Sequence, residues 1–191
     1  MILLPALAAS HYFIEKVVRP GDVVVDATVG NGHDTCFLAQ LVGPRGRVFG
    51  FDIQPLALER AAARLQEKGL VDRVQLFLAG HERLQEHVPV EWHGAVRAVM
   101  FNLGYLPGSD KSVKTKAETT IMALEASLNV LAPGGIVSVV VYTGHPEGKA
   151  EQEALYQWAS QLDQRRVQVA AYQFLNQVGH PPSLMVLEKL P

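Results

Sequence analysis

Acidic residues and glycines are grouped at the first strand-to-helix turn that the sequence predicts. Asp26 ends an apolar run, Gly30 and Gly32 follow, and Thr35 takes the place of the third glycine of dinucleotide-binding turns. Glycines let the backbone approach a ligand closely, although a tight turn without a ligand would also use them. The carboxylate of Asp26 would repel a pyrophosphate and attract a cation. The turn therefore favours a cationic methyl donor, S-adenosylmethionine, over a nicotinamide cofactor.

The next two predicted strand ends carry further candidates for this cofactor site. Asp52 ends the second strand, where a carboxylate can accept hydrogen bonds from both hydroxyls of a ribose. The alternative for Asp52 is the N-cap of the helix that begins near Pro55. Gln54 lies in the same turn and is a further cofactor candidate. His81 follows the third strand, where it would lie near the adenine or else be a solvated residue at a helix start.

The loop after the fourth predicted strand has the residue types that an amine acceptor needs. Asn102-Leu103-Gly104-Tyr105 keeps the amide and the aromatic ring of the Asp/Asn-Pro-Pro-Tyr/Phe pattern of nucleic-acid amine methyltransferases, but not its prolines. A neutral amine must point its lone pair along the methyl–sulfur bond, carbonyl oxygens can orient its N–H groups, and an aromatic ring can stack on a base. A surface loop rich in glycine and proline is the alternative.

Three lysines follow this loop, at positions Lys111, Lys114 and Lys116. Charge runs are usually solvated, but these flank the expected acceptor loop, and we interpret them as contacts to RNA phosphates. The formal net charge of the chain is -2. An RNA partner would therefore need a local basic patch of this kind.

The remaining reactive residue types give weaker signals. His145 and His180 follow predicted strands and are candidates for proton transfer, although a lone histidine is more often structural. Cys36 is the only cysteine, so no disulfide can form within the chain, and we expect a small buried residue on a helix. The histidines and the cysteine show no zinc spacing, so we expect no metal.

Alternating strand and helix patterns must position these residues. The predicted strands are 22–26, 47–52, 73–78, 95–101, 136–142, 167–174 and 184–188, and the predicted helices are a short N-terminal one, 34–42, 56–68, 118–131 and 149–162. This alternation indicates right-handed crossovers and an α/β, doubly wound, mostly parallel seven-stranded sheet. The last two strands have only a loop between them and should pair antiparallel. We expect a single domain over 1–191, with ligands beyond the carboxyl ends of the strands.

The sequence also bounds the compartment. No apolar stretch approaches the roughly 20 residues that span a bilayer, and the apolar start lacks the basic region of a signal peptide. With a single cysteine, this predicts a cytoplasmic protein that does not bind membranes.

Four segments together resemble one family. Residues 26–35, 101–111, 142–145 and 176–182 are similar to those of the small bacterial class I methyltransferases long labelled "putative rRNA methylases", whose members are tRNA 5-(aminomethyl)-2-thiouridine methyltransferases. The resemblance runs from about His11 to Lys189. It implies a Rossmann-like class I fold and transfer of a methyl group to the aminomethyl nitrogen of the wobble uridine.

The resemblance also implies a role for each motif residue. The residues that would hold S-adenosylmethionine are Asp26, Gly30, Asn31, Gly32, Asp34, Thr35 and Asp52, with Thr28 where common methyltransferases have their first glycine. The residues that would face the acceptor are Asn102, Tyr105, Tyr142 and His145. The implied partner is the anticodon loop of a tRNA. A homodimer is a further expectation, which no motif specifies.

Other functions remain open at this point. The same enzyme class could act on rRNA or on a small-molecule amine. A nucleotide-dependent oxidoreductase or a non-catalytic RNA-binding module would use the same fold.

Overall fold

A computed structural model describes residues 2–104, 115–144 and 146–191 of the chain. Its strands are β1 (Val23–Asp26), β2 (Arg47–Asp52), β3 (Val74–Leu78), β4 (Val96–Leu103), β5 (Leu131–Val141), β6 (Val167–Tyr172) and β7 (Ser183–Lys189). Its α-helices are α1 (Ala6–Val17), α2 (His33–Val42), α3 (Pro55–Glu67), α4 (Leu84–His87), α5 (Ala117–Val130) and α6 (Pro146–Ala159). Three short 3₁₀ turns are η1 (Val71–Arg73), η2 (His81–Arg83) and η3 (Val90–Trp92).

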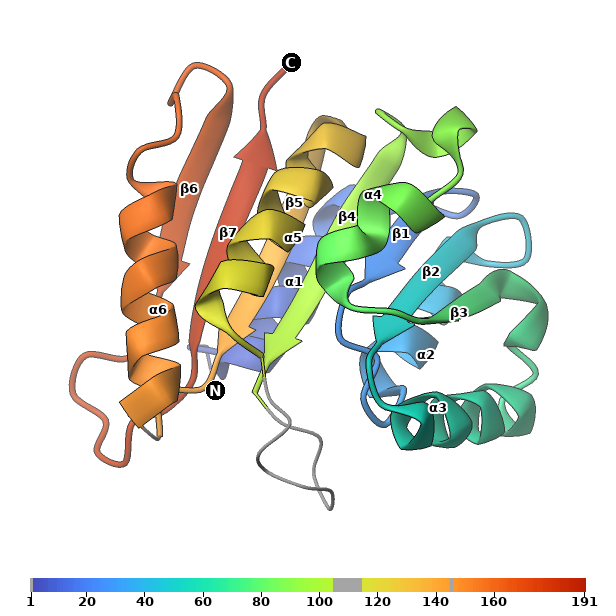
Figure 1. Ribbon diagram of the computed structural model, residues 1–191, viewed down its shortest axis with the longest axis horizontal. Coiled ribbons are helices and arrows are strands. Elements are labelled where there is room, and N and C mark those ends of the chain that lie inside the picture. Colours follow the sequence, from blue (N-terminus) through green and yellow to red (C-terminus); the bar gives the residue numbers. More distant parts are fainter. Residues whose placement is uncertain (1, 105–114, 145) are drawn as a thin grey trace.

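The strands form one sheet in the order β3-β2-β1-β4-β5-β7-β6 (Figure 1). Every pair from β3 to β5 is parallel, and β7 runs antiparallel to both β5 and β6. This confirms the predicted seven-stranded, mostly parallel sheet with an antiparallel last strand. The strand order reverses between β1 and β4, which is the place where open parallel sheets bind ligands.

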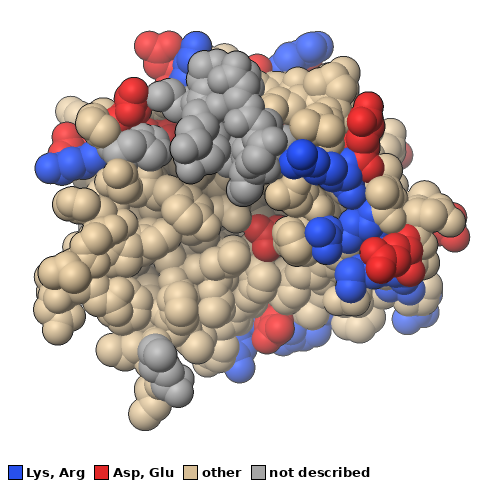
Figure 2. Space-filling view, turned by 90° about the horizontal axis from the view of Figure 1, so that it is seen from below, with Lys and Arg blue, Asp and Glu red and all other residues tan. Residues whose placement is uncertain are grey.

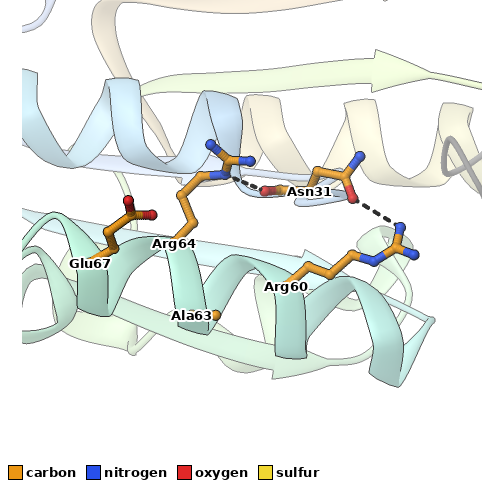
Figure 3. Close-up of a pocket in the computed structure, with 5 residues that line it drawn as sticks. All are labelled: Asn31, Arg60, Ala63, Arg64 and Glu67. Atoms are coloured by element: carbon orange, nitrogen blue, oxygen red, sulfur yellow. Dashed lines mark hydrogen bonds between the residues drawn. The ribbon is translucent and has the colours of Figure 1, made fainter.

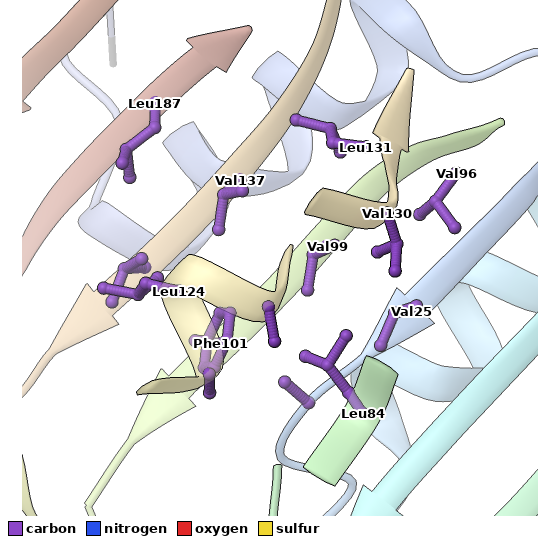
Figure 4. Close-up of a cluster of buried hydrophobic side chains, with 14 of the residues drawn as sticks. Val25, Leu84, Val96, Val99, Phe101, Leu124, Val130, Leu131, Val137 and Leu187 are labelled. Atoms are coloured by element: carbon purple, nitrogen blue, oxygen red, sulfur yellow. The ribbon is translucent and has the colours of Figure 1, made fainter. Parts of the chain in front are cut away.

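Helices cover both faces of the sheet, so the fold is doubly wound. In Figure 1, α4, α5 and α6 lie in front of the sheet, while α1 and α2 lie behind it. Figure 4 shows the front core, where Val99 and Phe101 of β4 pack against Leu124 and Val130 of α5. Because both faces are buried, the central strands are apolar along their length and do not alternate with polar residues.

Helix α1 connects the N-terminal segment to the half of the sheet that follows β4 in the strand order. It packs on β5 and β7, and Ser10 Oγ lies 2.6 Å from Ser138 Oγ of β5, with both side chains fully buried. The hydroxyl of Tyr172 at the end of β6 donates to the Leu4 carbonyl oxygen at 2.8 Å. These contacts fix the orientation of α1. They thereby also fix the backbone of His11, which follows Ser10.

Several predicted boundaries were wrong. Strand β4 continues through Leu103, and β5 begins at Leu131, so helix α5 ends at Val130. Leu131 pairs with Val96 before a register irregularity, which draws the segment containing Pro133 into the sheet. Helix α6 begins at Pro146, because a proline suits the first turn of a helix. Within the described ranges, no helix combines the length and the apolarity needed to cross a membrane.

Candidate functional site

The strand ends at the switch point bring Asp26 and Asn102 to the same edge of the sheet. Asp26 is the last residue of β1 and pairs with Met100 of β4, so Asn102 lies just beyond it on the neighbouring strand. The backbone N–H of Asn102 donates to Thr28 Oγ1 at 2.7 Å. The Thr28 hydroxyl thus ties the turn after β1 to the end of β4.

The carboxyl group of Asp26 is buried, with 1% of the residue exposed. Thr35 Oγ1 donates to its Oδ2 at 2.6 Å, and the backbone N–H of Thr28 donates to its Oδ1 at 3.1 Å. Burial, and then the nearby charge of Asp34, raise the pKa of Asp26 from 3.8 to about 7. A cation bound beside Asp26 would favour the ionised form, which burial disfavours.

The glycine turn packs directly against α3. Gly30 and Gly32 both have positive φ, at 51° and 76°. A Cβ atom on Gly32 would lie 2.8 Å from Ala61 Cα, so only glycine lets the start of α2 approach α3 this closely.

Asp52 links this turn to the one after β2. Its Oδ2 accepts the backbone N–H of Gly30 and its Oδ1 accepts that of Gln54, both at 2.9 Å. The N-cap of α3 is Gln54, so the capping alternative for Asp52 was wrong. Each carboxylate oxygen keeps a lone pair for a further hydrogen bond.

Asn31 is held by α3, as Figure 3 shows. Arg60 Nη1 donates to its side-chain oxygen at 3.2 Å, and Arg64 Nε donates to its backbone oxygen at 2.9 Å. A surface pocket lies here, lined by Asn31, Arg60, Ala63, Arg64 and Glu67. In this structure the Asn31 side chain therefore serves the contact between α2 and α3.

His81 lies in the site and not in solvent. It begins η2 after β3, and 9% of the residue is exposed. Its Nδ1 lies 3.3 Å from the carbonyl oxygen of Ala27, and its ring meets Phe101 edge-on at 5.5 Å. The solvated alternative was wrong, and burial lowers the pKa of His81 below its usual value.

Asp34 contacts both α1 and β4, two elements that the sequence did not predict to lie close together. Its Oδ1 lies 2.7 Å from His11 Nε2 of α1, and its Oδ2 accepts from Asn102 Nδ2 at 3.4 Å. The ring of His11 stacks on Phe37 with centroids 4.0 Å apart and an angle of 6° between the planes. His11 was not among the predicted site residues, because its position depends on how α1 docks on distant strands.

The acceptor side contains Asn102 and Tyr142. Asn102 Oδ1 is buried and has no hydrogen-bond partner among residues 2–104, 115–144 and 146–191. Burial, and then the charge of Asp34, raise the pKa of Tyr142 above its usual value, while a hydrogen bond with the Asn102 side chain acts in the opposite direction. The predicted residues Tyr105, His145, Lys111 and Lys114 lie outside the described residues. His180 lies exposed between β6 and β7.

A buried glutamate holds the chain on both sides of the 105–114 segment. Thr115 exchanges two hydrogen bonds with Gly104: its N–H donates to Gly104 O at 3.0 Å, and its Oγ1 accepts from Gly104 N at 3.1 Å. The same hydroxyl donates to Glu151 Oε2 of α6, and Thr120 Oγ1 of α5 donates to Oε1, both at 2.9 Å. Glu151 thereby fixes the end of β4 and the start of α5 to α6.

The face at the carboxyl ends of the parallel strands has an uneven charge distribution (Figure 2). Lys and Arg gather, with Asp and Glu among them, on the side of the view where α3 lies, while the lower part of the opposite side is largely uncharged. Lys116, directly before α5, is exposed. Among the described residues, no group of three or more His, Cys, Asp or Glu is placed to hold a metal ion. Cys36 is buried in α2, as predicted.

The chain is similar to proteins named as methylases or methyltransferases. The family described as "Putative rRNA methylase" matches residues 48–188. A relative from Arabidopsis thaliana named "tRNA (mnm(5)s(2)U34)-methyltransferase, chloroplastic" is 40% identical, over 96% of this chain and 69% of its own length.

Two solved structures cover the whole chain. A protein from Clostridium thermocellum described as a putative rRNA-methylase is 44% identical, with a TM-score of 0.95 and full coverage of both chains. A putative methyltransferase from Streptococcus mutans, in complex with SAH, is 38% identical, with a TM-score of 0.88 and full coverage of both chains.

Proposed function

Because this chain belongs to the family described as "Putative rRNA methylase" and is an S-adenosylmethionine-dependent methyltransferase, we propose that its substrate is tRNA. The acceptor is the aminomethyl nitrogen of 5-aminomethyl-2-thiouridine at the wobble position. The name of the Arabidopsis relative, which specifies this uridine, supports the proposal.

The observation that carries the proposal is the buried carbonyl oxygen of Asn102. It has no hydrogen-bond partner in the part of the chain that the structure describes, and a buried acceptor left unpaired costs about 1–3 kcal/mol, so its place near the end of β1 supports a site kept for a ligand N–H. A neutral primary amine offers two N–H groups and one lone pair. If one N–H donates to Asn102 Oδ1, the lone pair is free to face the methyl group.

The residues around Asp26 fit the methyl donor. S-adenosylmethionine supplies an electrophilic methyl group on a positively charged sulfur, together with an ammonium group. Asp26 would pair with the ammonium group. Thr28 and Thr35 would hold the carboxyl group of Asp26 through their hydrogen bonds. Gly30 and Gly32 would let the backbone approach the ligand.

Other residues would bind the adenosine part. Asp52 would accept the ribose hydroxyls, with Gln54 beside it, and His81 would lie near the adenine. Asn31 would support this pocket through its contacts with α3, and Asp34 would add a second negative group near Asp26.

On the acceptor side the chain would bind and orient the nucleoside. In the transfer the amine lone pair forms the new C–N bond while the C–S bond breaks, and its electron pair stays on sulfur. The methylated nitrogen then releases one proton. Tyr142, Tyr105 and His145 would surround the base, and Lys111, Lys114 and Lys116 would contact phosphates.

Nucleoside mass spectrometry of tRNA from a strain that lacks the gene tests the proposal. We expect 5-aminomethyl-2-thiouridine to accumulate, and the methylated nucleoside to return with the wild-type gene but not with an Asn102→Ala gene. Unchanged tRNA nucleosides would contradict the proposal. If rRNA from the strain that lacks the gene had lost a methyl group instead, rRNA would be the substrate.

Three further expectations accompany this function. We propose that residues 1–191 act as one methyltransferase domain, that the enzyme works in the cytoplasm, and that it forms a homodimer. Light scattering of the purified protein measures the last of these, and a monomer across the working concentration range would contradict it.

A further inference from the structure

We propose that His11 is a positioning residue for methyl transfer. It holds Asp34, and Asp34 fixes the side-chain amide of Asn102 so that the carbonyl oxygen faces the acceptor amine. This inference rests on the proposed function and gives a role to a helix outside the β1–α2 cofactor turn.

The His11 ring is held on two sides by one helix. Phe37 stacks on the ring at 4.0 Å, and Asp34 binds its Nε2 at 2.7 Å. Asp34 and Phe37 are three residues apart on α2 and therefore lie on the same face of that helix. The stack fixes the plane of the imidazole, and the hydrogen bond fixes its rotation within that plane.

The backbone of His11 is fixed from the opposite direction. Its neighbour Ser10 is fully buried against Ser138 of β5, and Ile14, one turn later, is also fully buried. Helix α1 therefore cannot slide without breaking core contacts. His11 reaches the site from an anchored element, although 30% of its side chain is exposed.

Asp34, which His11 holds, in turn orients the side chain of Asn102. A carboxylate only accepts hydrogen bonds, so Asp34 selects the NH₂ group of the Asn102 amide and places Oδ1 on the other side. The backbone of Asn102 is already held by Thr28 at 2.7 Å. The remaining freedom of Asn102 is the rotation of its amide, which the hydrogen bonds with Asp34 and Tyr142 restrict.

Loss of the His11 N–H would lower the rate of methyl transfer without weakening the binding of the methyl donor. Among the described residues, the Asp34 carboxyl group would keep one hydrogen bond, the long one of 3.4 Å from Asn102 Nδ2, and it could turn away from that amide. The amide of Asn102 would then lose the acceptor that orients its NH₂ group. Asp26 would keep its hydrogen bonds from Thr28 and Thr35, so the carboxyl group that meets the cation would be unchanged.

Two substitutions separate the hydrogen bond from the stack. His11→Phe keeps an aromatic ring for Phe37 and removes the N–H, whereas His11→Gln removes the ring and keeps an N–H for Asp34. We expect His11→Phe to lower kcat on aminomethyl-thiouridine tRNA by about 10- to 100-fold. The KM for tRNA and the Kd for S-adenosylhomocysteine should stay within about twofold, and His11→Gln should recover most of the rate.

Tyr12→Phe is the matched control, because it changes the next residue of the same helix, which is 47% exposed. It should leave kcat, KM and Kd at wild-type values. Thermal unfolding of each variant shows whether the fold is intact. If His11→Phe does not fold, His11→Gln with wild-type S-adenosylhomocysteine affinity and a rate as low as that of Asn102→Ala would still overturn the proposal.

The outcomes separate this inference from the function on which it rests. A wild-type enzyme that does not methylate this tRNA overturns both. Wild-type activity with an unchanged kcat for His11→Phe overturns the positioning role alone. Equal losses of kcat and of S-adenosylhomocysteine affinity in both His11 variants would also overturn it, because that result describes a purely structural residue.

Discussion

Three aspartates of the cofactor turns have the same carboxyl group but three different environments. Asp52 accepts two backbone N–H groups, Asp34 pairs with His11, and Asp26 is buried with two hydrogen-bond donors and Asp34 nearby. Of these, Asp26 has its pKa raised to about 7. It is therefore the residue whose ionisation a bound cation changes most.

Methyl-donor affinity should depend on pH through Asp26. Because its pKa in the folded protein, about 7, lies above the unperturbed 3.8, the unliganded fold loses stability as pH rises between these values. A bound cation favours the ionised form, so affinity should fall by up to about tenfold per unit as pH drops below 7. Calorimetry with S-adenosylhomocysteine between about pH 5.5 and pH 8 measures this.

The Asp26→Asn variant is the control for this titration. It should bind more weakly, with an affinity that no longer varies over the same pH range. A wild-type Kd that is constant between these limits would show that Asp26 does not face the ammonium group.

At the scale of elements, the contact between α2 and α3 depends on Gly32. Gly32→Ala should destabilise the protein by about 2–4 kcal/mol, since a left-handed residue and a contact with Ala61 both resist the new Cβ. Gly69→Ala is the matched control: its φ of +64° is similar, but nothing lies within 4 Å of the added Cβ. It should cost only about 1–2 kcal/mol. Equal decreases in stability on denaturant unfolding would show that crowding by α3 is unimportant.

The hydrogen bond between Thr120 of α5 and Glu151 of α6 can be tested by substitutions at two neighbouring threonines. Thr120→Val removes a fully buried hydroxyl that donates to Glu151 and should cost about 1.5–3 kcal/mol of unfolding free energy. Thr119→Val changes the half-buried neighbour, whose hydroxyl donates to Lys116 O near the surface, and should cost at most about 0.5 kcal/mol. Chemical denaturation gives both values, and a Thr120→Val protein as stable as wild type would contradict a structural role for Glu151.

The sequence could predict the elements better than it could predict contacts between distant ones. Apolar runs and glycine turns gave the strands, the parallel sheet and the antiparallel pairing of β6 with β7. Periodicity could not reveal that β5 begins at Leu131, because a proline and two glycines normally end a strand. The pairing of His11 with Asp34 depends on how α1 docks, which local pattern does not contain.

At the scale of the whole molecule, net charge says little about where RNA would bind. The chain is slightly acidic, yet Lys and Arg are concentrated on one side of the face at the strand ends (Figure 2). Attraction of a tRNA must therefore come from local groups and not from the average field.

Reversing the charges of Lys111, Lys114 and Lys116 to glutamate should weaken tRNA binding. The slope of log affinity against log salt should become shallower by roughly 0.7–0.9 for each phosphate that the protein no longer neutralises. Lys16→Glu, a change near the last turn of α1, is the control and should leave the slope unchanged. Filter binding over a range of salt concentrations measures the slope, and a triple variant with the wild-type slope would place the RNA elsewhere.

The docking of α1 on β5 also has a consequence during protein synthesis. Ser10 and Ser138 are 128 positions apart, so α1 leaves the ribosome long before the strand that receives it. The glycine turn and the aspartates after β1 and β2 can assemble early, whereas His11 is anchored only once β5 has emerged. A nascent chain would thus form the turns after β1 and β2 first, and would become competent for transfer only after β5 has emerged.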